Sequence, residues 1–348
     1  MSLNPVRIGL VGYGFGGRYF HAPLLAAADE CDFLGVVTTD EQRRSQVAAE
    51  HPSVQVYDDL AALAAAGAEA VAVSTPAATH IPLAQEALRL GLAVVSDKPF
   101  ALDAAAARET VELAERLGVP LTVYQNRRWD SDYLTLRRVI DDGEIGDVTR
   151  FESRFERFVP AKGPSAAGGG SLRDFGSHLV DQALVLFGPA RDVYARWHQR
   201  PDLDDRDDEF FLAITHVDGV RSHLSGSWVE GAPDLRFRVT GTTGSYVVDG
   251  VDGQEQALID GRTPATEGDK WGTEPQDRWG FVQRGADRAT VPSERGRWDT
   301  YYPAFARAVR GQGSLPVDPW DSVRALEVLD AARVSATSGG VVVVGGND

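Results

Sequence analysis

A lysine and a histidine stand where an α/β protein could use them to move protons. Lys98 follows directly after the apolar run 93–96. Polar side chains at the carboxyl ends of parallel strands face the crevice where ligands bind. Asp174, His178 and Asp181 are spaced four and three residues apart, so a helix would carry all three on one face. The helix pattern points to proton transfer by the histidine, and the lysine ammonium could stabilise an alkoxide that develops beside it.

The aspartate that precedes the histidine admits two interpretations. A carboxylate one helical turn from an imidazole orients the ring and raises its basicity, so Asp174 and His178 form a candidate general-base pair. Ser171 and Asp174 also fit a capping box, which would place Asp174 at a helix start, and the two roles can coexist. We expect no metal, because no further His or Cys stands where it would complete a metal site.

A glycine-rich pattern, G-x-G-x-x-G, follows the first apolar run and opens a helix-like stretch. In that setting the first glycine permits a tight turn, the second lets a pyrophosphate approach the backbone, and the third lets helix and strand pack closely. The pattern therefore predicts a dinucleotide site, with a plain glycine turn as the alternative. Its residues are Gly12, Tyr13, Gly14, Phe15, Gly16 and Gly17.

The choice between NAD and NADP depends on the end of the second strand, where an acidic residue would bind the ribose 2′-hydroxyl. If Asp40 is that residue, NAD is favoured. If Thr39 occupies the position, its hydroxyl together with Arg43 or Arg44 would hold a 2′-phosphate. A shift of one residue changes the answer, so both cofactors stay open from the residues alone. A solvated helix face is the alternative role of the two arginines.

Strand-like and helix-like runs alternate through the first third of the chain, which predicts βαβ units and a doubly wound parallel sheet. We expect residues 1–124 to form a dinucleotide-binding Rossmann domain. The expected strands are 6–11, 33–38, 54–56, 70–74, 93–96 and 120–124, and the expected helices are 15–28, 41–50, 58–66, 79–91 and 103–117.

Beyond residue 125 the pattern changes to one typical of an antiparallel sheet. The runs 210–217 and 220–229 are joined by Asp218-Gly219, which favours a hairpin turn. The run 148–159 fits a helix or a strand. We expect residues 125–348 to form an α+β domain for substrate binding and oligomerisation, with a large, mainly antiparallel, open-faced sheet. Further expected elements are helices at 131–142, 300–310 and 321–337, strands at 235–239, 245–248 and 341–344, and long loops at 200–209 and 261–285.

Composition limits the classes of partner. The chain has 348 residues, with 35 Lys and Arg against 51 Asp and Glu, and a formal net charge of −16 at pH 7. Such a chain repels polyphosphate and anionic membranes, so we expect no nucleic-acid or membrane partner. A single cysteine, Cys31, excludes an intrachain disulfide. With no apolar run long enough to cross a bilayer and no signal-peptide pattern, the expected location is cytoplasmic.

Together these motifs resemble the Gfo/Idh/MocA oxidoreductase family over essentially the whole chain. The segments 124–130 and 250–255 further resemble its NADP-dependent scyllo-inositol dehydrogenase branch, which slightly favours NADP over NAD. The motifs are the glycine pattern, Thr75-Pro76 with His80, Asp97-Lys98-Pro99, the set Asp174, His178 and Asp181, and the C-terminal residues Tyr301, Tyr302, Phe305, Pro316 and Val317.

The resemblance implies roles for individual residues. It makes Lys98, Asp174 and His178 catalytic, and it places Asp97 where the family usually has Glu. It also implies a C-terminal helix that returns to the first domain, and a homodimer or homotetramer formed through the sheet. The residues that it assigns to the cofactor include Thr75, Pro76, His80 and Lys98, and those that it assigns to the substrate are Asn126, Arg127 and Asp181.

The predicted function is hydride transfer between a nicotinamide cofactor and a secondary hydroxyl group of a cyclic polyol or sugar, such as an inositol. Two alternatives are a cofactor-sensing regulatory protein of the same fold and an NAD-dependent glycoside hydrolase. Relatives that act as repressors lack the catalytic lysine and histidine, so the presence of Lys98 and His178 favours an enzyme. Aromatic candidates for the substrate pocket, or equally for the core, are Trp271, Trp279, Tyr301 and Tyr302.

Overall fold

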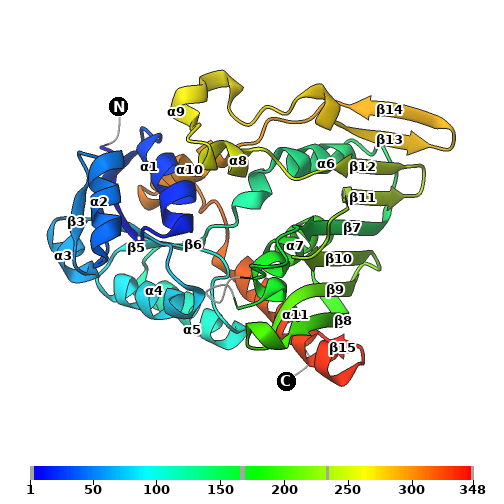
Figure 1. The fold of residues 1–348 in the computed structure, drawn as a ribbon, viewed down its shortest axis with the longest axis horizontal. Helices are drawn as coiled ribbons and strands as arrows, with labels where there is room; N and C mark the ends of the chain where they lie inside the picture. Colours follow the sequence, from blue (N-terminus) through cyan, green and yellow to red (C-terminus); the bar gives the residue numbers. More distant parts are fainter. Residues whose placement is uncertain (1–3, 165–168, 233–234, 346–348) are drawn as a thin grey trace.

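The computed structural model describes residues 4–164, 169–232 and 235–345. Two sheets dominate it: a six-stranded sheet from the N-terminal third and a nine-stranded sheet from the rest, side by side (Figure 1). Helices lie around the first sheet and between the two sheets. This arrangement confirms the predicted combination of a parallel α/β sheet with a large, mainly antiparallel sheet.

The first sheet has the strand order β3-β2-β1-β4-β5-β6, and every pair in it is parallel. The order reverses between β1 and β4, the kind of point at which doubly wound sheets bind ligands. All six strands were predicted, with ends shifted by one or two residues. They are β1 Val6–Val11, β2 Cys31–Val37, β3 Gln55–Tyr57, β4 Ala70–Val73, β5 Ala93–Ser96 and β6 Leu121–Val123.

All five helices predicted here are present, and Asp40, Asp59 and Asp103 cap three of them by accepting a backbone N–H three residues on. The predicted helix 15–28 is helical over residues 15–26, but it is not a regular α-helix. One turn of π-helix, Gly17–His21, leads into a short α1 in which Pro23 has no N–H for an α-helical bond. The helices are α1 Ala22–Ala26, α2 Glu41–Glu50, α3 Leu60–Ala65, α4 His80–Arg89 and α5 Ala104–Leu117.

The nine-stranded sheet has the order β14-β13-β12-β11-β7-β10-β9-β8-β15, with only β7 and β10 parallel among its described pairs. The run 148–159 is a strand to residue 156, because Phe151 and Phe155 both pack into the core on one face. The predicted hairpin is β9–β10. The strands are β7 Val148–Glu156, β8 Ala190–Arg200, β9 Arg206–His216, β10 Arg221–Ser227, β11 Leu235–Gly241, β12 Ser245–Asp249, β13 Gly280–Arg284, β14 Asp287–Val291 and β15 Val342–Val343.

Both predicted loops shrink in the structure. The loop 200–209 is only the short connection between β8 and β9, and 261–285 contains a helix and β13. Strands β8, β13 and β14 were not predicted from the sequence. The run of β8 is rich in charge, β13 is only five residues long, and β14 is a mostly exposed edge strand. The remaining helices are α6 Ser131–Asp141, α7 Ser171–Phe187, α8 Gln254–Ile259, α9 Pro264–Glu267, α10 Tyr301–Val309 and α11 Pro319–Ser338.

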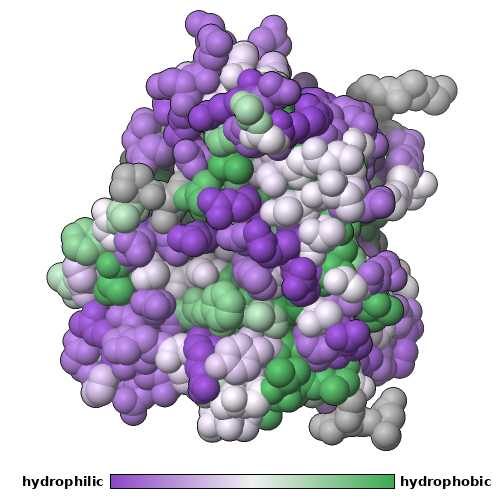
Figure 2. Space-filling model, turned by 90° about the vertical axis from the view of Figure 1, so that its right-hand side faces the viewer, coloured by the Kyte–Doolittle hydropathy of each residue, from purple (hydrophilic) through white to green (hydrophobic). Residues whose placement is uncertain are grey.

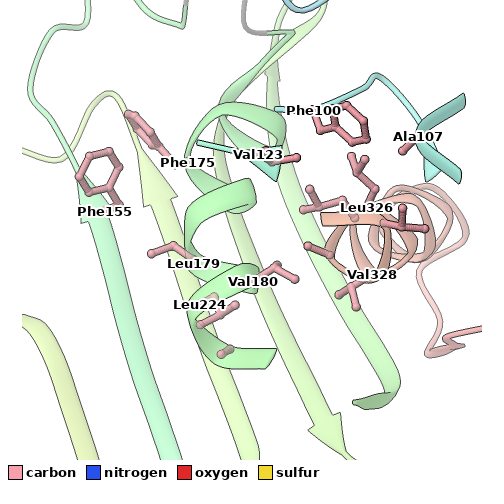
Figure 3. Packing of buried hydrophobic residues seen from close by; sticks show 14 of the residues in the cluster. Phe100, Ala107, Val123, Phe155, Phe175, Leu179, Val180, Leu224, Leu326 and Val328 are labelled. Atoms are coloured by element: carbon pink, nitrogen blue, oxygen red, sulfur yellow. The ribbon is translucent and has the colours of Figure 1, made fainter. Parts of the chain in front are cut away.

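Helix α7 lies between the second sheet and α11, and its apolar side chains point to both (Figure 3). Leu179 and Val180 are fully buried on it. α11 also packs on α5, where the backbone N–H of Ala104 donates to Asp330 at 2.8 Å. α10 joins the core of the first sheet through Tyr301 and Tyr302. These contacts fix α7 relative to both sheets.

The other side of the second sheet is open. The helices that contact this sheet lie on the side facing the first sheet (Figure 1). Viewed from that end of the molecule, hydrophobic side chains lie among hydrophilic ones (Figure 2). Phe211 and Val343 are exposed on β9 and β15. Among the described helices none is both long and apolar enough to span a bilayer.

Candidate active site

Two adjoining cavities lie between the first sheet and α7. One, of about 390 Å³, is lined by the glycine loop and the residues after β4, and is named here the cofactor-side cavity. The other, of about 430 Å³, is lined by side chains from segments that follow strands of both sheets, and is named the substrate-side cavity. The cavities form one crevice at the carboxyl ends of β1, β4 and β5, the expected ligand position. Five residues border both: Phe15, Gly16, Asp97, Lys98 and Asp174.

The glycine loop fits a dinucleotide. Gly12 has φ +94°, and a Cβ there would stand 2.3 Å from the carbonyl oxygen of Ser74. A Cβ on Gly17 would stand 2.2 Å from the Gly12 carbonyl oxygen. Gly14 differs, because the nearest atom of the described residues to a Cβ there would be a guanidinium nitrogen of Arg43, at 4.0 Å. Its backbone is therefore open toward the cavity, as the approach of a pyrophosphate requires.

The predicted residues Thr75, Pro76 and His80 line the same cavity. His80 is buried, with Nε2 2.7 Å from the carbonyl oxygen of Thr75 and Nδ1 2.8 Å from that of Pro99. It therefore ties the loop after β4 to the loop that carries Lys98. Tyr13, by contrast, turns its side chain into the core and donates its hydroxyl to Glu50 at 2.8 Å, so its side chain does not border the cavity.

The residues after β2 separate into different roles. Asp40 accepts the backbone N–H of Arg43 at 3.0 Å as the cap of α2. Arg44 pairs with Glu41 and Asp58. Arg43 borders the cavity and makes no ion pair with any residue in the described ranges. Thr39 and Asp40 are exposed and do not border it.

Lys98 and Asp174 form the central ion pair of the crevice. Nζ of Lys98 stands 2.6 Å from Oδ1 of Asp174 and 3.4 Å from its backbone oxygen. The predicted bond between Asp174 and His178 is wrong: the carboxylate faces the ammonium, because a full positive charge attracts it more strongly than a neutral ring does. The shared helix face is correct, but a partner from another loop takes the aspartate.

His178 lies in the substrate-side cavity and is almost fully buried. Its Nδ1 has no hydrogen-bond partner among the described residues, and its ring meets Phe155 at a centroid distance of 6.2 Å. Burial is the main reason that the pKa of His178 lies well below its usual value, and the charges of Lys98 and Arg127 add to the effect. The ring is therefore neutral near pH 7 and able to accept a proton.

Asp97, beside the lysine, is held from three directions. Its carboxylate accepts the Lys98 backbone N–H at 2.7 Å and the Ser74 hydroxyl at 2.8 Å, and Nε2 of His21 lies 3.3 Å away. Burial would raise the pKa of Asp97, but His21, His80 and Lys98 outweigh it and hold that pKa well below its usual range. The sequence did not single out His21, which lies on the turn after the glycine loop.

The predicted residues Asn126 and Arg127 line the substrate-side cavity. Arg127 is buried, with a 3.1 Å contact to Asp130 and an ion pair to Glu255. Seven aromatic side chains also border this cavity, among them Phe155 on β7 and Phe175 on α7. They are Phe15, Phe20, Tyr124, Phe155, Phe175, Trp228 and Trp298. Trp271, Trp279, Tyr301 and Tyr302 are not among its lining residues, and the two tyrosines are fully buried in the core.

Asp181 does not reach this cavity. Its two carboxylate oxygens accept from Arg128 at 2.8 and 2.6 Å, and Arg128 also contacts Asp321 at 3.0 Å. The pair borders a different cavity of about 700 Å³, which is larger than either of the two cavities of the crevice and is not lined by Lys98 or His178. Seven residues of helix separate Asp174 from Asp181, roughly 10 Å along the axis, which takes Asp181 past the end of the crevice.

The start of α7 differs from the predicted capping box. The helix begins after Gly170, whose φ is +102°, and no side chain within the helix start caps it. The hydroxyl of Ser171 has no partner in the described structure. Instead, Asp207 on β9 accepts the backbone N–H of Leu172 at 2.6 Å. The carboxylate that anchors the start of α7 therefore comes from the second sheet.

Other lining residues were not predicted at all. Arg157, Lys162 and Glu255 border the substrate-side cavity, and Glu255 lies within the segment 250–255 that the sequence had marked only by resemblance. Among the described residues, no group of three or more His, Cys, Asp or Glu side chains is arranged to hold a metal ion.

Known proteins share this architecture along the whole chain. Residues 6–125 match the family described as "Oxidoreductase family, NAD-binding Rossmann fold", and residues 133–247 match the "GFO/IDH/MocA C-terminal domain". The uncharacterized oxidoreductase YdgJ of Escherichia coli is 35% identical, over 97% of both chains.

Two further oxidoreductases are similar to this chain along nearly its whole length. The scyllo-inositol 2-dehydrogenase (NADP(+)) IolW of Bacillus subtilis is 31% identical, over 96% of this chain and 95% of its own. A crystal structure described as that of an oxidoreductase from Klebsiella pneumoniae superposes with a TM-score of 0.90 at 35% identity, over 99% of this chain and 97% of the other. The chain therefore belongs to the Gfo/Idh/MocA family of oxidoreductases, and it is a dehydrogenase with a nicotinamide-binding fold.

Proposed function

We propose that the chain catalyses the reversible NADP-linked oxidation of a secondary hydroxyl group on a cyclic polyol or sugar. The observation that carries the proposal is that Lys98 and Asp174 border both the cofactor-side and the substrate-side cavity, while His178 lines the substrate-side cavity. The relative IolW, named for scyllo-inositol and NADP(+), supports the substrate class. In balanced form, a secondary alcohol and NADP⁺ give a ketone, NADPH and one proton.

Each residue of the site has a separate role in the proposed reaction. A bound nicotinamide supplies the hydride acceptor. His178, neutral and buried, takes the proton of the hydroxyl group. The ammonium of Lys98, held by Asp174, stabilises the developing alkoxide. Asn126 and Arg127 would bind other hydroxyl groups of the substrate. Asp174 thus acts on the lysine rather than on the imidazole.

The preference for NADP is supported by the residues after β2. Asp40, the candidate reader of an NAD ribose, uses its carboxylate to cap α2. Arg43 keeps a guanidinium beside the cavity with no carboxylate partner in the described ranges, which suits a 2′-phosphate.

The proposal is tested by measuring the turnover of candidate substrates. The purified protein is incubated with inositols or aldoses and with NADP⁺ or NAD⁺ separately, and the absorbance of reduced nicotinamide is followed. We expect reduction of NADP⁺ with at least one polyol. NADPH binding without turnover of any polyol would favour the cofactor-sensing alternative. Release of a sugar without net nicotinamide reduction would favour glycoside hydrolysis.

Assembly and domain division belong to the same proposal. Exposed apolar side chains such as Phe211 on the open face of the second sheet support a homodimer or homotetramer formed there. The change from parallel to antiparallel pairing supports a cofactor domain at 1–124 and a substrate domain at 125–348. Light scattering of the wild type and of Phe211→Asp tests the assembly, with a smaller particle expected for the variant.

A further inference from the structure

The carboxylates that line the substrate-side cavity are all matched by cations or donors. Asp174 pairs with Lys98, and Asp97 accepts from Ser74 and from a backbone N–H. Glu255 is shared between Arg127 and Arg157. Arg127 also pairs with the buried Asp130 at 3.1 Å, so Glu255 balances the charge of Arg157.

Arg157 holds hydrogen-bond donors in a fixed position. It follows β7, and its guanidinium carbon lies 5.4 Å from the ring centre of Phe155, 6.0 Å from that of Phe175 and 5.8 Å from that of Trp228. One terminal nitrogen donates to Glu255 at 2.5 Å. The other guanidinium N–H groups have no acceptor among the described residues, and 38% of the side chain is exposed. The aromatic faces hold the group while leaving donors for a ligand.

A second cation lies on the same wall. Lys162 borders the cavity from the turn after β7, where its backbone N–H bonds the carbonyl oxygen of Val159 at 3.1 Å. Its ammonium makes no ion pair with a residue in the described ranges. Arg157 and Lys162 therefore place two positive groups on the wall formed by the segment after β7. Lys98, in contrast, follows β5 of the first sheet.

We propose that Arg157 and Lys162 form a subsite for an anionic group, so that the substrate is a polyol or sugar that carries a carboxylate or a phosphate. This inference rests on the proposed dehydrogenase function and deepens it. Neutral polyols carry no charge to match the ammonium of Lys162, whereas an anionic group would match it and accept charge-assisted hydrogen bonds from the fixed guanidinium of Arg157. The hydroxyl that is oxidised lies at the other end of the substrate, beside His178.

The experiment compares paired ligands on the full-length protein: glucose with glucuronate, and glucose with glucose 6-phosphate, which separates a carboxylate from a phosphate source. kcat/KM is measured with NADP⁺ for the wild type and for Arg157→Gln, Lys162→Gln and Arg157→Lys. The control is Arg262→Gln, which removes the same charge from an exposed arginine that does not border the cavity.

We expect one anionic ligand of a pair to exceed its neutral partner, and Arg157→Gln to lower that advantage about 10- to 100-fold, the usual value of a hydrogen bond to a charged group. Arg157→Lys should recover part of it, Lys162→Gln should lower it less, and Arg262→Gln should leave it unchanged. The Kd of NADPH should stay constant in all variants. An unchanged anionic advantage in Arg157→Gln, a wild type that prefers the neutral partner, or a cofactor defect in Arg157→Gln would each overturn the subsite.

Calorimetric binding separates this inference from the proposed reaction. If none of the ligands is oxidised, glucuronate and glucose 6-phosphate are titrated against the wild type and Arg157→Gln. Binding that the variant loses would support the anionic subsite while the dehydrogenase proposal fails. Equal binding by the two proteins would overturn the subsite whatever the turnover.

Discussion

The two halves of the crevice are built in different ways. The cofactor half is mostly backbone and small side chains: Gly12, Gly14 and the loop after β4, tied by His80. The substrate half is built of charged and aromatic side chains from segments far apart in the chain, with Arg127 and Arg157 converging on Glu255. The first half follows from a local pattern, and the second depends on which charges meet after folding.

This difference predicts separable functions. A change in the substrate half should alter chemistry and specificity while leaving cofactor affinity intact, and a change in the cofactor half should do the reverse. Helix α7 lies between the two halves, because its N-terminal end is positioned by Lys98, which follows β5 of the first sheet, and by Asp207 on β9 of the second.

The substitution with the largest expected effect on the substrate half alone is His178→Ala. We expect kcat to fall by about 10²- to 10⁴-fold, the usual contribution of a general base. The Kd of NADPH, measured by fluorescence titration, should not change. His223→Ala on β10, away from the crevice, serves as the control. A variant that keeps full turnover would remove His178 from the reaction.

The pair formed by Arg128 and Asp181 should behave as structure rather than as substrate binding. Arg128→Met leaves the buried carboxylate of Asp181 without its partner, so we expect a loss of about 3–5 kcal/mol in the free energy of unfolding, measured in urea. Arg324→Met is the matched control, because it removes an exposed arginine from the neighbouring Asp321 and should cost less than about 1 kcal/mol. If Arg128→Met instead keeps its stability and changes substrate preference, Asp181 regains the role that the sequence suggested.

Arg43 tests the cofactor half alone. Arg43→Ala should raise the KM for NADP⁺ about 10- to 100-fold, since it removes a charge-assisted contact to the 2′-phosphate. The KM for NAD⁺ should stay the same, because NAD⁺ lacks that phosphate. Arg44→Ala, whose guanidinium pairs with Glu41 and Asp58, is the control. Equal effects on both cofactors would place Arg43 outside phosphate recognition.

The sequence predicted most of the fold and the cofactor half because their signals are local. Strand, turn and helix follow one another around Gly12, and each glycine there has a role that its neighbours in the sequence define. Asp174 shows why the substrate half was harder. Its spacing to His178 is correct for one helix face, yet the pairing was decided by Lys98, 76 residues away in the chain.

Other errors have the same cause. In the sequence, nothing distinguishes Arg157 from the other charged residues near β7. Its position over the rings of Phe175 and Trp228 arises only when these distant segments meet in the fold. Asp207 lies 35 residues from the helix start that it anchors, so the nearer Ser171 was the natural candidate. Spacing determines which residues share a face, whereas charge and burial determine which of them pair.

The anchor at the start of α7 offers the smallest and most specific test. Burial raises the pKa of Asp207 to about 6, despite the bond from Leu172. The unfolded chain releases this proton near pH 4, so between about pH 4 and pH 6 the folded state binds more protons than the unfolded state. Stability therefore falls as pH rises through this window, by up to about 1.4 kcal/mol per pH unit from this group.

Asp207→Asn removes the titration while its amide oxygen can still accept from Leu172. Urea unfolding across that window should show a smaller loss of stability with rising pH than in the wild type, and kcat should be retained if the helix keeps its place. Asp204→Asn, at an exposed position on the same connection, should leave the slope unchanged. An unaltered slope in Asp207→Asn would show that Asp207 is ionised throughout. The start of α7 would then be anchored by an ionised carboxylate of Asp207, as Lys98 is held by the ionised Asp174, rather than by a neutral carboxyl group.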